Sequence, residues 1–375
     1  MAISSEEGNP EEYRQTGSAM KKIMMIIPTL TGGGAERVAS LLSHEWSKNH
    51  DVTVVVFTLE NQIFPVSGKL IDLNLGARKS ILMRKIYRLF HRTVVLSKII
   101  SRTKPDLIVS LMESANIPAI IACSVKGEKG KLKVSVHGNP QEIRNPLTRL
   151  TLRLLYPLAN SVVAPSVGVE KSLFDLGISK DSLSVIPNPA KVKLSIELPP
   201  HPLDNNKPYI LGAGRLDPLK GFDDLIRSFA LLPDPELTLV ILGKGSELDR
   251  LQILTSDLGI SNRVIFPGFI NNLEPWFRHA ECFCLTSKSE SSSMVIVEAL
   301  GYGCPVVSYD TDFGPREILL DGHVGALVAK GEIEALASKI SVVINDDGLR
   351  ADFISRGHKR YLDFQPEKVA RLWLT

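Results

Sequence analysis

The sequence predicts an α/β fold with two domains, each built on a parallel β-sheet that helices cover on both faces. The chain has 375 residues, which is more than one hydrophobic core usually serves. Short apolar segments alternate with helical segments in both halves, and this alternation is typical of parallel sheets. A proline-rich polar stretch, 199–208, separates the halves and suits an interdomain linker. We expect a first domain over 20–198 and a second over 209–375, whose last helix could pack back on the first.

The first half begins with a glycine-rich loop between a strand and a helix. Residues 22–28 are apolar and predict the strand, and residues 35–47 predict the helix. Between them, Gly33 and Gly34 either let the backbone approach a ligand closely or simply permit a tight turn. Neither half has G-x-G-x-x-G with a downstream acid, which excludes a dinucleotide-dependent dehydrogenase. Further strands of the first half are expected at 52–58, 107–110, 133–137 and 162–164.

Composition excludes several classes of function. The net charge of +3 is too small to indicate nucleic-acid binding, and no apolar run is long enough to span a membrane. Residues 1–19 are polar and acidic without periodicity, so they predict a disordered extension. The four cysteines show neither a zinc spacing nor a disulfide framework, which fits a reducing cytoplasm. Cys282 and Cys284 fall on a predicted strand, and we expect their side chains on opposite sides of it.

In the second half, a basic loop follows the first predicted strand. Residues 209–213 predict the strand, and the loop 214–221 carries Arg215 and Lys220. An arginine fork and a lysine point charge at the carboxyl end of a strand can neutralise a diphosphate. The alternative is an ordinary basic surface loop. Glycines also follow the predicted strands of this half, namely Gly214 after 209–213, Gly243 after 239–242, and Gly268 with Phe269 after 264–266.

The stretch 286–301 joins another strand to a helix through a serine-rich loop. Residues 282–285 predict the strand, and the serines are placed to cap the helix that follows. Glu290 lies in the loop, and Glu298 lies about two turns into the helix. A helix start suits a phosphate, and carboxylates beside it can bind hydroxyl groups, so a sugar nucleotide would satisfy both. The alternative is that both glutamates are simply exposed.

Residues 78–104 form a basic segment in which leucines, isoleucines and a tyrosine are interleaved with the charges. A basic amphipathic helix of this kind can lie on an anionic membrane surface. It can equally be a solvated helix with a core-facing stripe, and both interpretations stay open. The basic residues are Arg78, Lys79, Arg84, Lys85, Arg88, His91, Arg92, Lys98, Arg102 and Lys104.

Three of these patterns together resemble one enzyme family over roughly residues 22 to 345. They are the E-x7-E spacing of Glu290 and Glu298, the Gly-Arg-Leu and Lys-Gly elements within 214–221, and Gly-Gly-Ala-Glu-Arg at 33–37. They resemble the retaining glycosyltransferases of family 4, whose GT-B fold has two Rossmann-like domains facing across a cleft. The resemblance implies transfer of a hexosyl or N-acetylhexosaminyl unit from a nucleoside-diphosphate sugar, expected to be a UDP-sugar, to a glycan or lipid-linked glycan in surface polysaccharide synthesis. It implies no cofactor, no metal, and a cytoplasmic location at the inner face of the membrane.

The resemblance also implies a role for each motif residue. Glu290 and His137 would contact the donor sugar, and Arg215 and Lys220 would hold the diphosphate, and these four would be the catalytic residues. Asp310 and Asp312 have the spacing of metal ligands in another transferase class, but we interpret them as part of a loop. The remaining donor contacts implied are Gly33, Gly34, Gly214, Gly243, Gly268, Phe269, Ser292, Ser293, Met294, Val295 and, on the ribose, Glu298.

The chain departs from the family pattern at two places. Ser291 and Ser292 stand where the family usually has glycine and then an aromatic residue, and Lys244 stands where an acidic residue is common. Added Cβ atoms and hydroxyls change the local backbone and the sugar pocket, so the donor sugar is open. Two alternatives remain, a sugar-nucleotide epimerase of the same fold and a non-catalytic nucleotide-sugar-binding protein. Product analysis without an acceptor separates the transferase from the epimerase.

Overall fold

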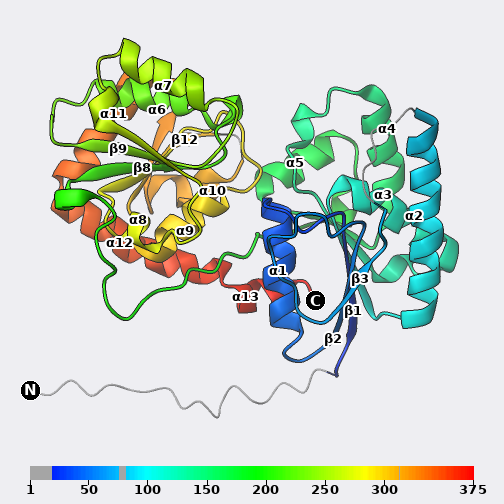
Figure 1. Cartoon of the computed structure of the whole chain (residues 1–375). Coiled ribbons are helices and arrows are strands. Elements are labelled where there is room, and N and C mark those ends of the chain that lie inside the picture. The colour runs from blue at the N-terminus through cyan, green and yellow to red at the C-terminus, as the bar shows by residue number, and fades with distance from the viewer. Residues whose placement is uncertain (1–18, 76–81, 312) are drawn as a thin grey trace, which may run out of the picture.

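The computed structural model describes residues 19–75, 82–311 and 313–375, and these form two α/β domains (Figure 1). The first domain has a seven-stranded sheet in the order β3-β2-β1-β4-β5-β6-β7, and every neighbouring pair of strands is parallel. Its strands are β1 (Lys22–Ile27), β2 (Asp51–Val56), β3 (Lys69–Asp72), β4 (Leu107–Leu111), β5 (Leu132–Ser135), β6 (Ser161–Ala164) and β7 (Leu183–Val185). Its helices are α1 (Gly34–Trp46), α2 (Leu82–Thr103), α3 (Glu113–Lys126), α4 (Pro146–Leu155) and α5 (Val167–Asp175).

The second domain repeats this plan with six parallel strands in the order β10-β9-β8-β11-β12-β13. The predicted fold class, two Rossmann-like domains with parallel sheets, is therefore confirmed. Its strands are β8 (Tyr209–Ala213), β9 (Thr238–Leu242), β10 (Val264–Gly268), β11 (Cys282–Leu285), β12 (Val306–Asp310) and β13 (Ala326–Ala329). Its helices are α6 (Phe222–Ala230), α7 (Leu248–Asp257), α8 (Glu274–Arg278), α9 (Met294–Tyr302), α10 (Pro315–Ile318), α11 (Ile333–Asn345) and α12 (Asp347–Tyr361).

Each sheet separates two hydrophobic cores because successive side chains of a strand point to opposite faces. In β1, Met24 and Ile26 pack on one face with residues of α2 and α3. Ile23, Met25 and Ile27 pack on the other face with residues of α1. The central strands β4, β8, β9 and β11 are buried along their whole length, since both faces of each sheet are covered there.

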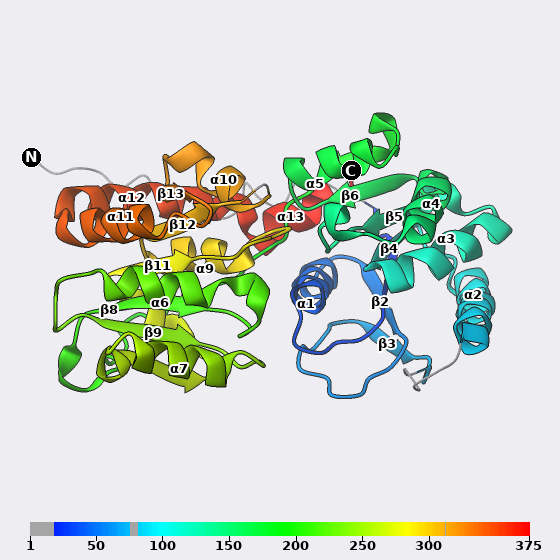
Figure 2. The same cartoon turned by 90° about the horizontal axis from the view of Figure 1, so that it is seen from above.

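The chain passes between the domains twice. After β7 it enters the core of the second domain at Ala190, whose amide donates to the carbonyl of Phe364 at 2.9 Å. After α12 it returns as α13 (Pro366–Leu372), which lies beside α1 in both views (Figures 1 and 2). There the Trp46 indole donates to the carbonyl of Ala370 at 3.1 Å, and Trp373 joins the core around α1. The last helix thus packs on the first domain.

The strand order places a ligand position at one edge of each sheet. β1 lies between β2 and β4, and β8 lies between β9 and β11, so the strand order reverses beside β1 and β8. Ligands of such sheets bind outside the carboxyl ends of the strands at this reversal. The loops that begin there are the glycine loop before α1, the basic loop after β8 and the serine-rich loop after β11.

Several local expectations need correction or lie outside the described residues. The strand expected over 133–137 ends at Ser135, so His137 lies beyond it in a loop. The Sγ atoms of Cys282 and Cys284 are 3.8 Å apart, because residues i and i+2 of a strand share a face. The expected extension over 1–19 lies outside the described residues, except for its last residue. Within the described ranges, every helix is too short or too polar to cross a bilayer.

Candidate functional site

Polar contacts join the loops at the facing edges of the two sheets. Ser291 Oγ donates to the backbone carbonyl of His137 at 2.8 Å, and Asn139 Nδ2 donates to Ser289 Oγ at 3.1 Å. Ser166 Oγ, before α5, donates to the carbonyl of Ser291 at 3.2 Å. The serine-rich loop of the second domain therefore touches the loops after β5 and β6 of the first. We call this region the domain junction.

The glycine loop brings the start of α1 to the junction. Glu36 is buried and accepts hydrogen bonds from the hydroxyls of Thr29 at 3.1 Å and Thr31 at 3.2 Å, which fixes the loop. A Cβ atom on Gly33 would lie 2.2 Å from a Glu36 carboxylate oxygen, so a side chain at Gly33 would displace this network. A Cβ on Gly34 would lie 3.8 Å from the sulfur of Met294, the first residue of α9. The first turns of α1 and α9 therefore face each other.

The start of α9 lacks the capping that the sequence predicts. Ser293 occupies the N-cap position, but its side chain makes no cap hydrogen bond. Its Oγ is buried and has no hydrogen-bond partner among the residues that the structure describes. Gly33, the N-cap residue of α1, likewise offers no capping side chain. Two helix starts without side-chain caps meet at the junction, and their partial positive charges suit an anion.

Lys220 and Glu290, both predicted from the sequence, meet at the junction. Lys220 Nζ lies 2.6 Å from Glu290 Oε1, and the two side chains are 24% and 9% exposed. Gly221 holds this geometry with φ near +61°, and a Cβ there would lie 2.2 Å from the carbonyl oxygen of Thr286. The basic loop therefore packs backbone against backbone on the loop after β11, and only glycine permits this close approach.

Arg215 does not join Lys220 and Glu290 in this structure. Its side chain is 76% exposed, and its Nε donates to Asp217 within the same loop at 2.6 Å. The backbone of Arg215 follows β8 at the carboxyl edge of the sheet, as the sequence predicts. Its guanidinium would have to turn away from Asp217 to reach a ligand held by Lys220.

Glu298 lies in the second turn of α9, because the helix starts at Met294, and its partner was not predicted. It is 3% exposed and forms an ion pair with Arg37 of α1, across the two domains. Burial raises the pKa of Glu298, and the Arg37 guanidinium opposes that rise. The Gly-Gly-Ala-Glu-Arg motif, which ends at Arg37, was the sequence signal that could have marked Arg37 as a site residue. Its pairing with Glu298 could not be predicted, because the two residues lie in different halves of the chain.

His137 presents an imidazole with a buried nitrogen. The residue as a whole is partly exposed, but its Nε2 is buried and has no hydrogen-bond partner among the described residues. Burial lowers the pKa of His137 to about 4, so the ring is neutral at pH 7. A neutral ring can offer one nitrogen as donor or acceptor to a bound molecule.

The predicted glycines of the second domain form a row along the sheet edge. The amide of Gly214 donates to the carbonyl of Leu242 at 2.9 Å, and that of Gly243 donates to Gly268 at 2.8 Å. Gly243 has φ near +144°, and a Cβ there would lie 1.8 Å from the carbonyl oxygen of Gly214. Phe269 follows at the end of the row with its side chain 58% exposed. The loops of this row are thus packed backbone against backbone, and Phe269 presents an exposed ring at their end.

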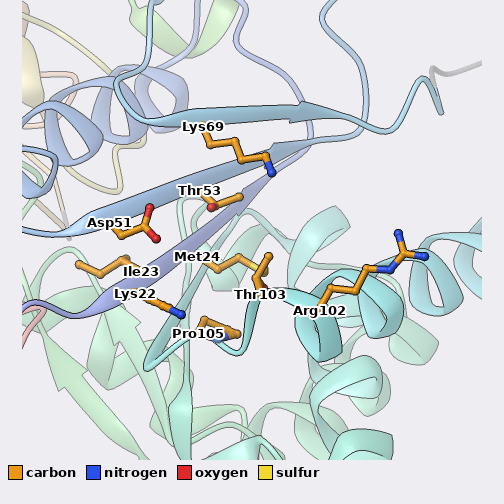
Figure 3. A pocket seen from close by; sticks show the side chains of 9 residues that line it. All are labelled: Lys22, Ile23, Met24, Asp51, Thr53, Lys69, Arg102, Thr103 and Pro105. Atoms are coloured by element: carbon orange, nitrogen blue, oxygen red, sulfur yellow. The ribbon is translucent and has the colours of Figure 1, made fainter.

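A separate cavity of about 240 Å³ lies at the other edge of the first sheet (Figure 3). Lys22, Asp51 and Lys69 line it at the starts of β1, β2 and β3, and Arg102 reaches it from the end of α2. It lies at the amino ends of the strands, whereas the junction lies at their carboxyl ends. None of the predicted site residues lines this cavity.

In the described part of the chain, no three His, Cys, Asp or Glu side chains group as metal ligands. Asp310 is bound by Arg316, whose Nε donates to it at 3.0 Å, and Asp312 lies outside the described residues. The chemistry that the junction offers is that of cations, helix starts and two carboxylates.

Two family models together match most of the chain. The model described as Glycosyltransferase Family 4 matches residues 32–193, and the model described as Glycosyl transferases group 1 matches residues 196–360. The boundary between the two models falls in the connection between the two sheets. Each domain of the structure therefore carries its own match.

Curated relatives match along most of their length. A Campylobacter jejuni protein is 27% identical over 95% of this chain and 98% of the relative, and it is named GalNAc-α-(1→4)-GalNAc-α-(1→3)-diNAcBac-PP-undecaprenol α-1,4-N-acetyl-D-galactosaminyltransferase. The lipopolysaccharide core biosynthesis glycosyltransferase LpsE of Rhizobium meliloti is 30% identical over 73% of this chain and 76% of the relative.

Solved structures share the fold. Anabaena HepE in complex with UDP and glucose superposes with a TM-score of 0.73 at 22% identity, covering 94% of this chain and 98% of that chain. The apo form of the lipopolysaccharide outer core galactosyltransferase WaaB superposes with a TM-score of 0.73 at 24% identity, covering 93% of this chain and 97% of that chain. At these identities the likeness concerns the fold.

Proposed function

This chain belongs to glycosyltransferase family 4, and from that premise we propose that it transfers a hexosyl or N-acetylhexosaminyl unit from a UDP-sugar to a glycan or lipid-linked glycan acceptor. The names of the Campylobacter and Rhizobium relatives support a lipid-linked or lipopolysaccharide acceptor. The UDP complex of Anabaena HepE supports a uridine nucleotide as the donor carrier. Synthesis of a bacterial surface glycan, from the cytoplasmic face of the membrane, is the corresponding cellular role.

The observation that carries the proposal is the meeting of Lys220, Glu290, Glu298 and the start of α9 at one junction. A diphosphate needs positive charge, which Lys220 and the uncapped first turn of α9 supply. Sugar hydroxyls need acceptors, and the two carboxylates flank that turn. A sugar nucleotide carries a diphosphate and sugar hydroxyls on one molecule.

Each predicted residue then has a place in the reaction. Lys220, with Arg215 turned inward from Asp217, stabilises the negative charge that develops on the leaving diphosphate. Glu298 accepts hydrogen bonds from the ribose, and Glu290 contacts the donor sugar and supports its positive character. His137 contributes its neutral imidazole from the opposite domain. The backbone contacts to the donor come from Gly33, Gly34, Gly214, Gly243, Gly268, Ser292, Ser293, Met294 and Val295, and Phe269 lies beside the base.

We propose retention at the anomeric carbon, by analogy with the retaining family, and we assign no covalent nucleophile. The leaving oxygen and the incoming hydroxyl then share one face of the sugar. The cations at the junction hold the departing diphosphate, and the attacking hydroxyl passes its proton to that leaving group. This arrangement uses no metal ion, so the reaction should continue in the presence of a chelator.

We propose that the acceptor side of the enzyme works at a membrane, with the basic segment 78–104 contributing a contact. Side chains of residues 78–86 lie outside what the structure describes. Of the remainder, Arg92 is half-buried and packs over the Phe57 ring at 4.1 Å, so its guanidinium is held against the protein rather than on a free basic face. Tyr87 and Phe90 are 65% and 67% exposed and would add a minor contact with a lipid surface.

The test is UDP release from a panel of UDP-sugars, with and without lipid-linked acceptors and chelator. We expect Lys220→Ala to lose about 2–4 kcal/mol of transition-state stabilisation, which is roughly 30- to 1000-fold in kcat/KM. Glu290→Gln should fall comparably. A matched control is Lys288→Ala, which removes an exposed lysine from the loop that carries Glu290. Lys288 pairs with Asp223 at 3.5 Å. Unchanged rates in both site variants, or a free epimerised sugar nucleotide as the sole product, would discard the proposal.

A further inference from the structure

α4 carries a stripe of leucines that faces solvent. Leu147, Leu150 and Leu154 are 69%, 51% and 61% exposed. Their spacing of i, i+3 and i+7 places them on one side of the helix, whereas the buried Leu152 faces the protein. Single exposed leucines are ordinary, whereas these three form one continuous apolar stripe along the helix. We call these three residues the leucine stripe.

Arginines flank the leucine stripe. Arg144, Arg149 and Arg153 are exposed, and Arg149 and Arg153, four positions apart, lie together beside the stripe. Among the described residues, no carboxylate pairs with any of the three. Over 141–155 the one acid is Glu142, so three arginines and one glutamate leave a net charge of +2. The surface is therefore apolar along its centre and cationic along its side.

The position of α4 places this surface on the first domain, away from the second. A short loop connects His137 to the start of α4. In that loop, Asn139 donates a hydrogen bond to Ser289 of the other domain. α4 and α2 both lie toward the end of the first domain that is remote from the second domain (Figures 1 and 2). A partner bound along α4 would therefore leave the second domain uncovered.

We propose that the leucine stripe of α4 inserts into the interface of an anionic lipid bilayer while the flanking arginines contact the lipid headgroups. This inference rests on the proposed function, because a lipid-linked acceptor would lie in that bilayer. An amphipathic helix with leucines on one side and arginines beside them has the chemistry of a surface-bound membrane helix. Each arginine near an anionic surface adds to the attraction, and salt weakens that part.

A second copy of this chain fits the surface less well. A helix of ten residues is about 15 Å long and about 10 Å wide, so its outer face covers on the order of 150 Å². A stable protein interface buries about 800 Å² on each partner. A two-fold contact through α4 would also bring the arginines of both copies close together, where like charges repel. A bilayer has no such area requirement and supplies the opposite charge.

The test is co-sedimentation of the full chain with vesicles of phosphatidylcholine alone and of phosphatidylcholine mixed with phosphatidylglycerol. Wild type should bind the mixed vesicles, and added salt should weaken this binding. The triple variant L147S/L150S/L154S should bind them at least about tenfold more weakly. R144Q/R149Q/R153Q should lose the preference for the anionic lipid. The matched control is Leu231→Ser, which replaces a leucine 54% exposed at the end of α6 in the second domain and should bind as wild type does.

Two further measurements keep the outcome interpretable. Thermal unfolding and UDP release with a water-soluble acceptor should be the same in the triple variant and wild type, because the stripe touches neither core nor junction. Y87S/F90S, which alters α2 instead, should retain most of the binding. Wild-type binding in the triple variant, loss of binding only in Y87S/F90S, or a dimer that the triple variant abolishes would each overturn the proposal. Stripe-dependent vesicle binding in a protein that turns over no UDP-sugar would refute the proposed function and leave the membrane contact standing.

Discussion

The ion pair between Arg37 and Glu298 allows a quantitative prediction, because it joins the two domains and one partner is almost completely buried. Removing one partner of a buried ion pair typically costs 3–5 kcal/mol, since the other charge is left without compensation. The Glu298 side chain is 4% exposed, but that of Arg37 is 30% exposed, so water already screens part of the attraction. We therefore expect Arg37→Gln to cost about 2–3 kcal/mol of unfolding free energy at neutral pH.

The pH dependence of that loss has a definite sign. Burial raises the pKa of Glu298 and Arg37 opposes the rise, so Arg37→Gln raises this pKa further. A carboxyl group with a raised pKa in the folded state binds more protons folded than unfolded, so stability falls as pH rises above its unfolded pKa. Arg37→Gln should thus be closest to wild type at acid pH, where Glu298 is protonated, and should lose stability as the pH rises. Nearby groups that could add to the titration are Tyr302 and Tyr361, both with raised pKa values, and Glu274.

UDP affinity should follow the opposite trend. A protonated Glu298 is a poorer acceptor for ribose hydroxyls, so the affinity of Arg37→Gln for UDP should rise with pH as Glu298 loses its proton. Urea unfolding and titration calorimetry over a pH series measure the two quantities. R37Q/E298Q should recover most of the stability, since no buried charge remains. Arg250→Gln is the matched control, because its surface pair with Glu247 is worth at most about 1 kcal/mol. A loss of stability in Arg37→Gln that grows toward acid pH would refute the reasoning.

Three further predictions concern single residues. Gly243→Ala should destabilise the second domain by more than about 3 kcal/mol in urea unfolding, because the added Cβ would lie 1.8 Å from the carbonyl oxygen of Gly214. The control is Gly259→Ala, which has open space around the added Cβ and φ near +69°, and which should cost about 1 kcal/mol. His137→Gln should lower the rate of UDP release but leave its pH profile unchanged around pH 6 to 8, because the pKa of His137 is about 4; a profile that loses a step near 6.5 would contradict this. Phe269→Ala should leave unfolding within about 0.5 kcal/mol of wild type, because the ring is exposed, yet weaken UDP binding in calorimetry.

Local features of the fold could be predicted where the sequence marks both ends of an element. The strands at 209–213 and 282–285 have the predicted bounds, because an apolar run stops at a glycine in one and at polar residues in the other. Lys220 and Glu290 were assigned to one site from their separate motifs, and the structure places them 2.6 Å apart. Parallel strands made this possible, since loops at their carboxyl ends necessarily share one edge of the sheet.

Features that depend on contacts between distant segments could not be predicted. The pairing of Arg37 with Glu298 forms only where the two domains contact each other. The hydrophobic periodicity of the sequence carries no information about that contact. The capping of α9 was predicted from the serines, but among the described residues the Ser293 hydroxyl has no partner. The backbone of Ser293, with φ near −79° and ψ near +74°, departs from the extended conformation that is usual for an N-cap residue. The motif assigned Arg215 to the site. In the structure, however, its side chain pairs with Asp217 and is 76% exposed.

In the proposed binding mode, these contacts make donor binding an exchange of partners rather than the filling of an empty charged site. Lys220 is paired with Glu290, and Glu298 is paired with Arg37, so a diphosphate and a ribose must each displace a charged side chain. The two carboxylates are at most 9% exposed, and salt screens such buried pairs far less than it screens exposed charges. We therefore expect the dissociation constant of UDP to change by less than about threefold when the salt concentration is raised tenfold. A steep loss of affinity with salt in calorimetry would instead mean that exposed cations such as Arg215 attract the nucleotide from solution, and the exchange would not describe binding.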